Sequence, residues 1–226
     1  MLRATTPLPG TTIDPRYPDS DGRPMGETDF HSIALRFLCD ALQDFFAGLD
    51  VYIAMNLLMY YKQGEPEGHR DPDILVAKGV GTHKRRSFRF WEEKHKPCVL
   101  FEIASRKTRK EDLGAKRTLY QRLGIAEYFV FDPEGKYLDP VLQGFRLRKG
   151  VYVPMKADAA GSLVSRRLGL RLLPEDEMLR LVDFKTGTPV PTRQERAEQE
   201  KQRADQLARD VQRLRAQLRE QTPNGE

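Results

Sequence analysis

The centre of this 226-residue chain alternates short apolar runs with a segment of helical spacing. Residues 73–77, 98–103 and 127–131 are short, mainly apolar and rich in branched or aromatic side chains, which predicts buried β-strands. Residues 112–123 lie between the last two runs, show helical spacing and end before Gly124, a residue typical of helix C-termini. The order strand, strand, helix, strand predicts a mixed central sheet with a helix crossing over it.

Segments on either side extend this mixed α/β pattern. They predict a helix over 28–48, a strand over 51–61, β-hairpins over 136–153 and a strand over 168–173. Residues 178–184 fit either a further strand or a short helix, and their periodicity does not decide between the two.

Composition divides the chain into three parts. Residues 1–24 are rich in Pro, Gly, Thr and Asp and show no period, which predicts an irregular N-terminal arm. Residues 25–188 contain the predicted helices and strands and are expected to form one domain. Residues 189–226 combine the end of a linker with a charged tail.

The tail over residues 192–221 lacks Gly and Pro and is dominated by Gln, Arg, Glu, Ala and Leu. Its apolar residues occupy a and d positions of a heptad repeat, namely Ala197, Ala204, Leu207, Val211, Leu214 and Leu218. Glu200 occupies a further d position and weakens the repeat. About three heptads give a lone helix little stability in water, so a coiled coil that makes the protein a homodimer is expected. The alternative is a single, highly charged helix.

Composition excludes several classes of protein. Hydrophobic residues make up 39% of the chain, enough for one packed core, but no run approaches the ~18 apolar residues of a membrane span. The first ten residues have no apolar core, so no secretory signal peptide is expected. Cys39 and Cys98 are the only cysteines, which excludes a disulfide scaffold and favours a reducing, cytoplasmic location. His31 is expected on a helix face, whereas His69, His83 and His95 are expected in loops without the spacing of a zinc site.

Positive charge is concentrated in residues 84–122. This basic stretch has thirteen Lys and Arg against five Asp and Glu, whereas the rest of the chain has 25 against 28. Focused positive charge attracts polyanions, nucleic acid above all, although a solvated surface that aids solubility is the alternative. Trp91 follows two phenylalanines in this stretch and either stacks on bases or, as we favour, anchors the loop to the core.

Two acidic residues accompany the apolar strand segments. Asp73 opens the run at 74–76, and Glu102 lies inside the run at 99–103. An acid in a core strand is costly unless it is paired or binds a metal. Carboxylates on adjacent strands could present two oxygen ligands to one Mg2+, which polarises a phosphate and lowers the pKa of a bound water.

Lys116 is the candidate third group of such a site. It lies on the predicted helix that follows the Glu102 strand, on the same face as Leu113 and Tyr120. A lysine there could stabilise the charge that builds on phosphate oxygens during hydrolysis. The alternative is structural, since Glu102 could simply form a buried ion pair with Lys116 or Arg106.

Four stretches between residues 21 and 150 carry a family resemblance. They read DGRPMGETDFH, NLLMYY, DPDILVAKGV and VLFEIASRKTRKEDLGAKRTLYQRLGIAEYFVFDPEG. In these stretches the chain resembles the Uma2 family of endonucleases, within the PD-(D/E)XK superfamily. The resemblance implies a restriction-endonuclease-like fold, a mixed central sheet flanked by helices, to which this chain adds a C-terminal helical tail. It also implies a phosphodiesterase site that depends on Mg2+ or Mn2+.

By this resemblance, Asp73 takes the place of the motif's Asp and Glu102 that of its second acid, and both would bind the metal. The plain motif has a Lys two residues after the second acid, but Ala104 stands there. This departure looks like the family's own variant, in which the lysine has moved to the following helix, and Lys116 matches that position. Glu27 could add a third acid, or could interact only with the positive end of the first helix.

The sequence therefore predicts a metal-dependent DNA endonuclease. In this reading Asp73 and Glu102 hold Mg2+, Lys116 stabilises charge, and the basic stretch binds DNA. The alternative is a catalytically silent nucleic-acid-binding or assembly module that keeps the fold and recruits partners through its tail. A structural protein organised by its coiled coil is a third hypothesis, which leaves the two acids unexplained.

Overall fold

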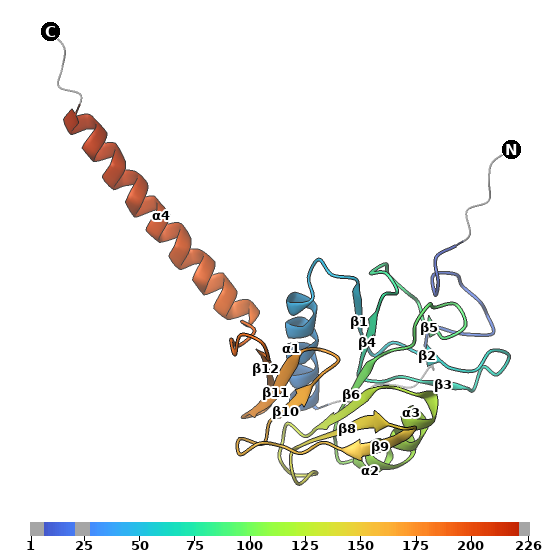
Figure 1. The fold of residues 1–226 in the computed structure, drawn as a ribbon. Helices are drawn as coiled ribbons and strands as arrows, with labels where there is room; N and C mark the ends of the chain where they lie inside the picture. The colour runs from blue at the N-terminus through green and yellow to red at the C-terminus, as the bar shows by residue number, and fades with distance from the viewer. Residues whose placement is uncertain (1–6, 21–27, 222–226) are drawn as a thin grey trace, which may run out of the picture. The chain divides into compact units, whose positions relative to one another are not determined.

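A computed structural model describes residues 7–20 and 28–221 of the chain (Figure 1). Contacts within the chain divide it into two units, Met1–Val190 and Pro191–Glu226. The first unit contains the mixed α/β fold, and the second contains one long helix, α4 (Arg193–Gln221).

The first unit begins with a helix and continues mainly as strands. Its helices are α1 (Asp29–Phe45) and a composite helix made of α2 (Arg109–Glu111), a π-helical turn η1 (Asp112–Lys116) and α3 (Arg117–Leu123). Its strands are β1 (Val51–Met55), β2 (Met59–Tyr60), β3 (His69–Arg70), β4 (Ile74–Lys78), β5 (Phe88–Arg89), β6 (Val99–Ile103), β7 (Glu127–Phe131), β8 (Leu142–Arg148), β9 (Val151–Pro154), β10 (Leu163–Ser165), β11 (Leu170–Glu175) and β12 (Met178–Asp183).

The central sheet has six strands in the order β1-β4-β6-β7-β8-β9. Strands β6 and β7 are parallel, and each of the other neighbouring pairs is antiparallel. A parallel pair needs a long crossover connection, and the composite helix supplies it between β6 and β7. The predicted mixed central sheet with a helix crossing over it is therefore confirmed.

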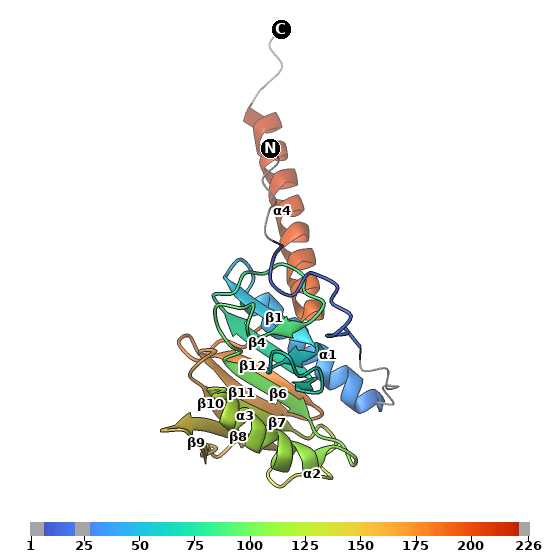
Figure 2. The same ribbon diagram turned by 90° about the vertical axis from the view of Figure 1, so that its right-hand side faces the viewer.

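Different elements bury the two faces of the central sheet (Figure 1 and Figure 2). Helix α1 and the small sheet β10-β11-β12 cover one face, against which Phe101 packs. The composite helix covers the other face, where Leu100 is buried together with Tyr120. Because side chains alternate along a strand, Glu102 points to the same face as Leu100. The sheet thus directs this acid toward the composite helix.

Several predicted boundaries differ from the structure. The strand predicted at 51–61 is divided into β1 and β2, because Asn56 adopts a left-handed backbone conformation with φ 51°. Residues 136–153 contain one hairpin, made of β8 and β9, and residues 178–184 contain a strand rather than a helix. The sequence pattern misses β10, since three residues are too few to show a period.

Residues 7–20 contain no helix or strand and pack beside the small sheet β3-β2-β5. Tyr17 is buried there, with its ring centre 5.2 Å from that of Tyr60 and 5.0 Å from that of Trp91. Trp91 therefore anchors its loop to an aromatic cluster, the role that the sequence interpretation favoured over base stacking.

Glu127 in β7 is a buried acid that joins two sheets. Its carboxylate accepts hydrogen bonds from Arg146 Nε at 2.9 Å, from Ser165 Oγ at 2.5 Å and from the backbone N–H of Arg166 at 3.1 Å. Arg146 also donates to the backbone carbonyl of Val164 at 2.7 Å. These contacts fasten the small sheet β10-β11-β12 to the central sheet.

We expect Glu127→Ala to lower the free energy of unfolding by about 3 kcal/mol, because it leaves the Arg146 guanidinium without its buried partner. Urea unfolding followed by circular dichroism measures the loss. Glu177→Ala, at an exposed position just before β12, is the control and should change stability by less than about 0.5 kcal/mol. Equal stabilities of the two variants would contradict the proposed link between the sheets.

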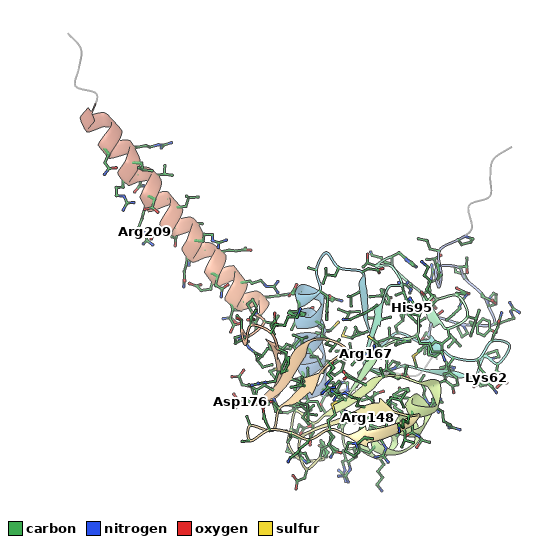
Figure 3. The ribbon with its side chains drawn as sticks, viewed as in Figure 1. Lys62, His95, Arg148, Arg167, Asp176 and Arg209 are labelled. Atoms are coloured by element: carbon green, nitrogen blue, oxygen red, sulfur yellow. The ribbon has the colours of Figure 1, made fainter. Side chains whose placement is uncertain are left out.

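Helix α4 has 29 residues and is polar along most of its length. Leu207, Val211 and Leu214 are exposed on it, and Figure 3 shows Arg209 among the side chains along the helix. The side chain of Leu218 lies outside the described part of the structure. Within that described part, no helix combines the length and apolar character needed to cross a bilayer.

Candidate active site

Asp73 directly precedes β4 and Glu102 lies in β6, and Figure 1 shows these two neighbouring antiparallel strands side by side. The pairing of β4 with β6 begins at Ile74, which lies across from Phe101, the residue before Glu102. The Asp73 carboxylate accepts a hydrogen bond from the backbone N–H of Ile103 at 2.6 Å. This bond holds the carboxylate against β6, so both acids lie at the same end of the strand pair.

The composite helix holds the Glu102 carboxylate with two side chains. Lys116 Nζ donates to Oε2 at 2.8 Å, and the Tyr120 hydroxyl donates to Oε1 at 2.9 Å. Lys116 and Tyr120 are four residues apart, so both lie on the helix face that meets the sheet. The structure thus brings Asp73, Glu102 and Lys116 together, and the ion pair between Glu102 and Lys116 is part of the arrangement.

Asp112 belongs to the same cluster, although the sequence does not single it out. It is fully buried, and its Oδ1 lies 3.1 Å from Lys116 Nζ. In the sequence it is one of five acids in the basic stretch. The signal that could have found it is its spacing of four residues from Lys116, which places an acid and a base side by side on a helix.

His31 approaches the cluster from α1. The hydroxyl of Thr28, the N-cap of the helix, accepts a hydrogen bond from the backbone N–H of His31 at 3.3 Å. His31 is buried, with Nε2 3.4 Å from Asp73 Oδ2. The sequence predicts only a histidine on a helix face, because this contact joins distant parts of the chain.

Burial and neighbouring charges shift the proton affinities within the cluster. Burial raises the pKa of Glu102 well above its ordinary value, the charge of Lys116 opposes this rise, and the carboxylates of Asp73 and Asp112 add to it. Burial also raises the pKa of Asp112. For Lys116, burial lowers the pKa, but the negative charges of Glu102 and Asp112 outweigh it, so the pKa lies above its ordinary value. Lys116 is therefore a cation at neutral pH.

Not every cation of the basic stretch at 84–122 is exposed, so only part of its charge is available to nucleic acid. Arg85 is buried, with Nε 2.6 Å from Glu93 Oε1, and Arg89 is buried as well. Together with Lys116, these cations are committed to contacts inside the protein. The exposed cations of the stretch are Lys84, Arg86, Lys94, Lys96, Arg106, Lys107, Lys110 and Arg122.

The donor chemistry of the cluster fits a divalent cation such as Mg2+. The cluster supplies carboxylate oxygens, the ligands that Mg2+ prefers, from the partly exposed Asp73 and the buried Glu102. No group of three or more His, Cys, Asp or Glu among the described residues could hold a metal ion. Asp73 and Glu102 would thus share the ion with water and substrate oxygens, as is usual for Mg2+. Glu27, the third acid considered from sequence, lies outside the described residues.

A groove of about 890 Å³ runs along the outer edge of β1. The C-terminal end of α1 and residues 81–85 form its walls. Asp73, Glu102 and Lys116 do not line it, so the groove is separate from the carboxylate cluster.

Comparisons with known proteins identify the family of this chain. A solved structure described as "a putative nuclease belonging to DUF820 from Anabaena variabilis ATCC 29413" matches with a TM-score of 0.47 and 14% sequence identity, covering 64% of this chain and 76% of that chain. A comparison with curated proteins finds no match. A family model described as "Uma2: Putative restriction endonuclease" matches residues 7–175. Because this match spans more than half of the chain, the resemblance seen in the sequence is confirmed and the protein belongs to the Uma2 family.

Proposed function

We propose that this protein is a metal-dependent endonuclease that hydrolyses phosphodiester bonds in DNA. One observation carries the proposal: the Asp73 carboxylate is held by the backbone N–H of Ile103, next to Glu102 on β6, and Lys116 donates a hydrogen bond to the Glu102 carboxylate. Membership in a family described as restriction endonucleases supports nuclease activity in general. The metal, the DNA substrate and the residue roles are our proposal.

In this proposal Asp73 and Glu102 hold Mg2+ or Mn2+. When bound, such an ion polarises a phosphate oxygen and lowers the pKa of a coordinated water, which supplies the nucleophile. The protein orients both carboxylates in advance, through the Ile103 backbone N–H on Asp73 and the Tyr120 hydroxyl on Glu102. Partners of this kind fix the direction of metal ligands and are usually important for activity.

Lys116 is proposed to stabilise negative charge on the phosphate. An ammonium group has three N–H donors; one donates to Glu102, and Asp112 lies in ion-pair contact at 3.1 Å. The third donor can face a phosphate oxygen. The attraction between this N–H donor and the phosphate charge is stronger here than in water, because a buried site screens charge weakly. The donor is also in place before the reaction starts.

Exposed cations beside the cluster are the proposed contacts to the DNA backbone. Arg106, Lys107 and Lys110 are exposed and lie where the chain passes from β6 into the composite helix. Glu102 and Lys116 flank this segment in the chain, so the segment borders the cluster. Contacts between cations and phosphates release counterions, which makes binding depend on salt.

Replacing Lys107 and Lys110 by Ala is expected to weaken DNA binding and to reduce the slope of log K against log salt concentration by about 2. Fluorescence anisotropy of a labelled duplex across a salt titration measures both effects. The control is the pair Lys156→Ala and Lys185→Ala, which makes the same charge change at exposed positions outside the basic stretch. Equal slopes for the two double variants would place the DNA elsewhere on the protein.

Nicking of supercoiled plasmid with and without Mg2+ tests the proposed activity directly. Conversion to open-circular or linear DNA only when Mg2+ is present supports the proposal. Cleavage that persists in a chelator contradicts the metal dependence, and cleavage of RNA but not of DNA contradicts the substrate.

A catalytically silent nucleic-acid-binding or assembly module is the second candidate function. The three exposed apolar side chains of α4 favour it, because they offer a surface to a partner. Such a module has no use for a buried cluster of acids around Lys116. DNA binding without cleavage in the presence of Mg2+ would support this second candidate.

We also propose that the protein is a homodimer through α4. Leu207 and Leu214 occupy d positions of the heptad repeat, Val211 occupies the a position between them, and all three are exposed. Pairing with a second copy would bury them. A β-branched residue at a with Leu at d favours two parallel helices.

A further inference from the structure

We propose that Asp112 is a positioning residue that holds the Lys116 ammonium toward the reacting phosphate. The proposal rests on the function proposed above, in which Lys116 acts on the substrate. Asp112 would contact neither DNA nor metal and would act through Lys116.

The Lys116 ammonium is held between carboxylates from two different elements. Its Nζ lies 2.8 Å from Glu102 Oε2 on β6 and 3.1 Å from Asp112 Oδ1 on the composite helix. A lysine side chain loses much rotamer entropy when it is fixed in one place. With Glu102 alone, the ammonium could swing about that carboxylate. The Asp112 carboxylate, in ion-pair contact with the ammonium, would restrict this motion.

The backbone departs from regular α-helix at this ion pair. Residues 112–116 form a π-helical turn that begins at Asp112 and ends at Lys116. The Thr118 hydroxyl donates a hydrogen bond to the backbone carbonyl of Gly114, inside this turn, at 3.0 Å. Turns of π-helix are rare and occur frequently at functional sites. Here the first and last residues of the turn, Asp112 and Lys116, are the two members of the ion pair.

Charge balance argues against a purely structural role for Asp112. Lys116 already has a buried counter-charge in Glu102, so a second carboxylate is not needed to neutralise it. Asp112 instead adds a second buried carboxylate beside the same ammonium. Burying an ion costs several kcal/mol, so a helix selected for stability alone would favour a neutral residue here. Positioning of Lys116 accounts for the acid.

Cleavage kinetics of a double-mutant cycle test the proposal in the full-length protein. Asp112→Asn should lower kcat on duplex DNA by about 10- to 100-fold, the usual effect of losing a residue that orients a catalytic group, and change KM far less. In a Lys116→Met background the same substitution should cause no further loss. Asp132→Asn is the control, since Asp132 is also buried but accepts hydrogen bonds only in its own loop from Glu134, Tyr137 and Leu138. The change in kcat caused by Asp132→Asn should be the same in the wild-type and the Lys116→Met backgrounds.

Lysine ammonium NMR gives a second readout that needs no activity. In the wild type, Lys116 should give a slowly exchanging ammonium signal that is absent from Lys116→Met, whereas exposed Lys107 should not. Asp112→Asn should broaden or remove this signal. If the Asn variant does not fold, the wild type still decides, because a Lys116 ammonium as mobile as that of Lys107 overturns the proposal.

The outcomes separate this proposal from the proposed function. Additive losses of kcat for Asp112→Asn and Lys116→Met, or an unaltered Lys116 signal in Asp112→Asn, overturn the positioning role and leave the nuclease proposal intact. Wild-type cleavage by Lys116→Met overturns the catalytic role of the lysine. An altered signal with no further loss of kcat in the double variant supports the positioning role.

Discussion

Glu102→Gln is expected to abolish metal-dependent cleavage, with a rate loss of at least about 10²-fold, and to leave DNA affinity unchanged or higher. The substitution keeps the shape of the side chain and removes the charge of a proposed metal ligand. Loss of a negative charge also lowers repulsion of the DNA phosphates. Plasmid nicking measures the rate, anisotropy measures the affinity, and calorimetry should show weaker Mg2+ binding than in the wild type.

Glu177→Gln is the matched control, because it removes the same charge from an exposed position just before β12. It should change neither cleavage nor Mg2+ binding. A Glu102→Gln variant that cleaves at the wild-type rate would make Glu102 a structural partner of Lys116 and Tyr120. Thermal unfolding of both variants separates loss of chemistry from loss of fold.

Removal of residues 192–226 is expected to convert a dimer into a monomer while the first unit stays folded. The exposed stripe of Leu207, Val211 and Leu214, the proposed dimer contact, is lost with the tail. The truncated chain keeps Val190, which is buried and donates its backbone N–H to the carbonyl of Leu181 at 2.8 Å. The contacts of the first unit are therefore retained. Light scattering measures the mass, and circular dichroism measures folding.

Point variants of the full chain test the same helix without truncation. Leu207→Asn with Leu214→Asn should dissociate the dimer, whereas Gln202→Asn with Gln212→Asn, at exposed positions outside a and d, should not. An unchanged dimer mass after truncation would place the interface in the first unit. A monomeric full-length protein would show that α4 is solvated or binds a different partner.

Local pattern in the sequence was enough to predict the central elements and the main candidates for the site. Glu102 stands out because a strand of apolar residues buries whatever lies among them, and an acid there needs a partner. Lys116 follows from helical periodicity, which turns it and Tyr120 toward the strand that precedes the helix. The roles of these residues in catalysis remain predictions.

The same pattern could not show which cations point inward. Thirteen Lys and Arg in the basic stretch look alike in composition, yet Arg85 pairs with Glu93 and is buried, while Lys107 is exposed. The difference depends on a loop that folds back on itself and on the arm at 7–20. Hydrophobic periodicity carries little information about such a loop, because its strand β5 (Phe88–Arg89) has only two residues.

Periodicity and turn residues are short-range properties, and they suffice for the mixed sheet, the crossover helix and the charged C-terminal helix. They report the local backbone and the face that each element buries. Three features depend on the packing of the whole chain. They are the position of His31 beside Asp73, the division of the strand at Asn56 and the hydrogen bond from Ser165 to Glu127. Each feature depends on which distant segment covers a buried face or joins the sheet. Packing of the whole chain determines that segment, and the sequence neighbours of a residue do not.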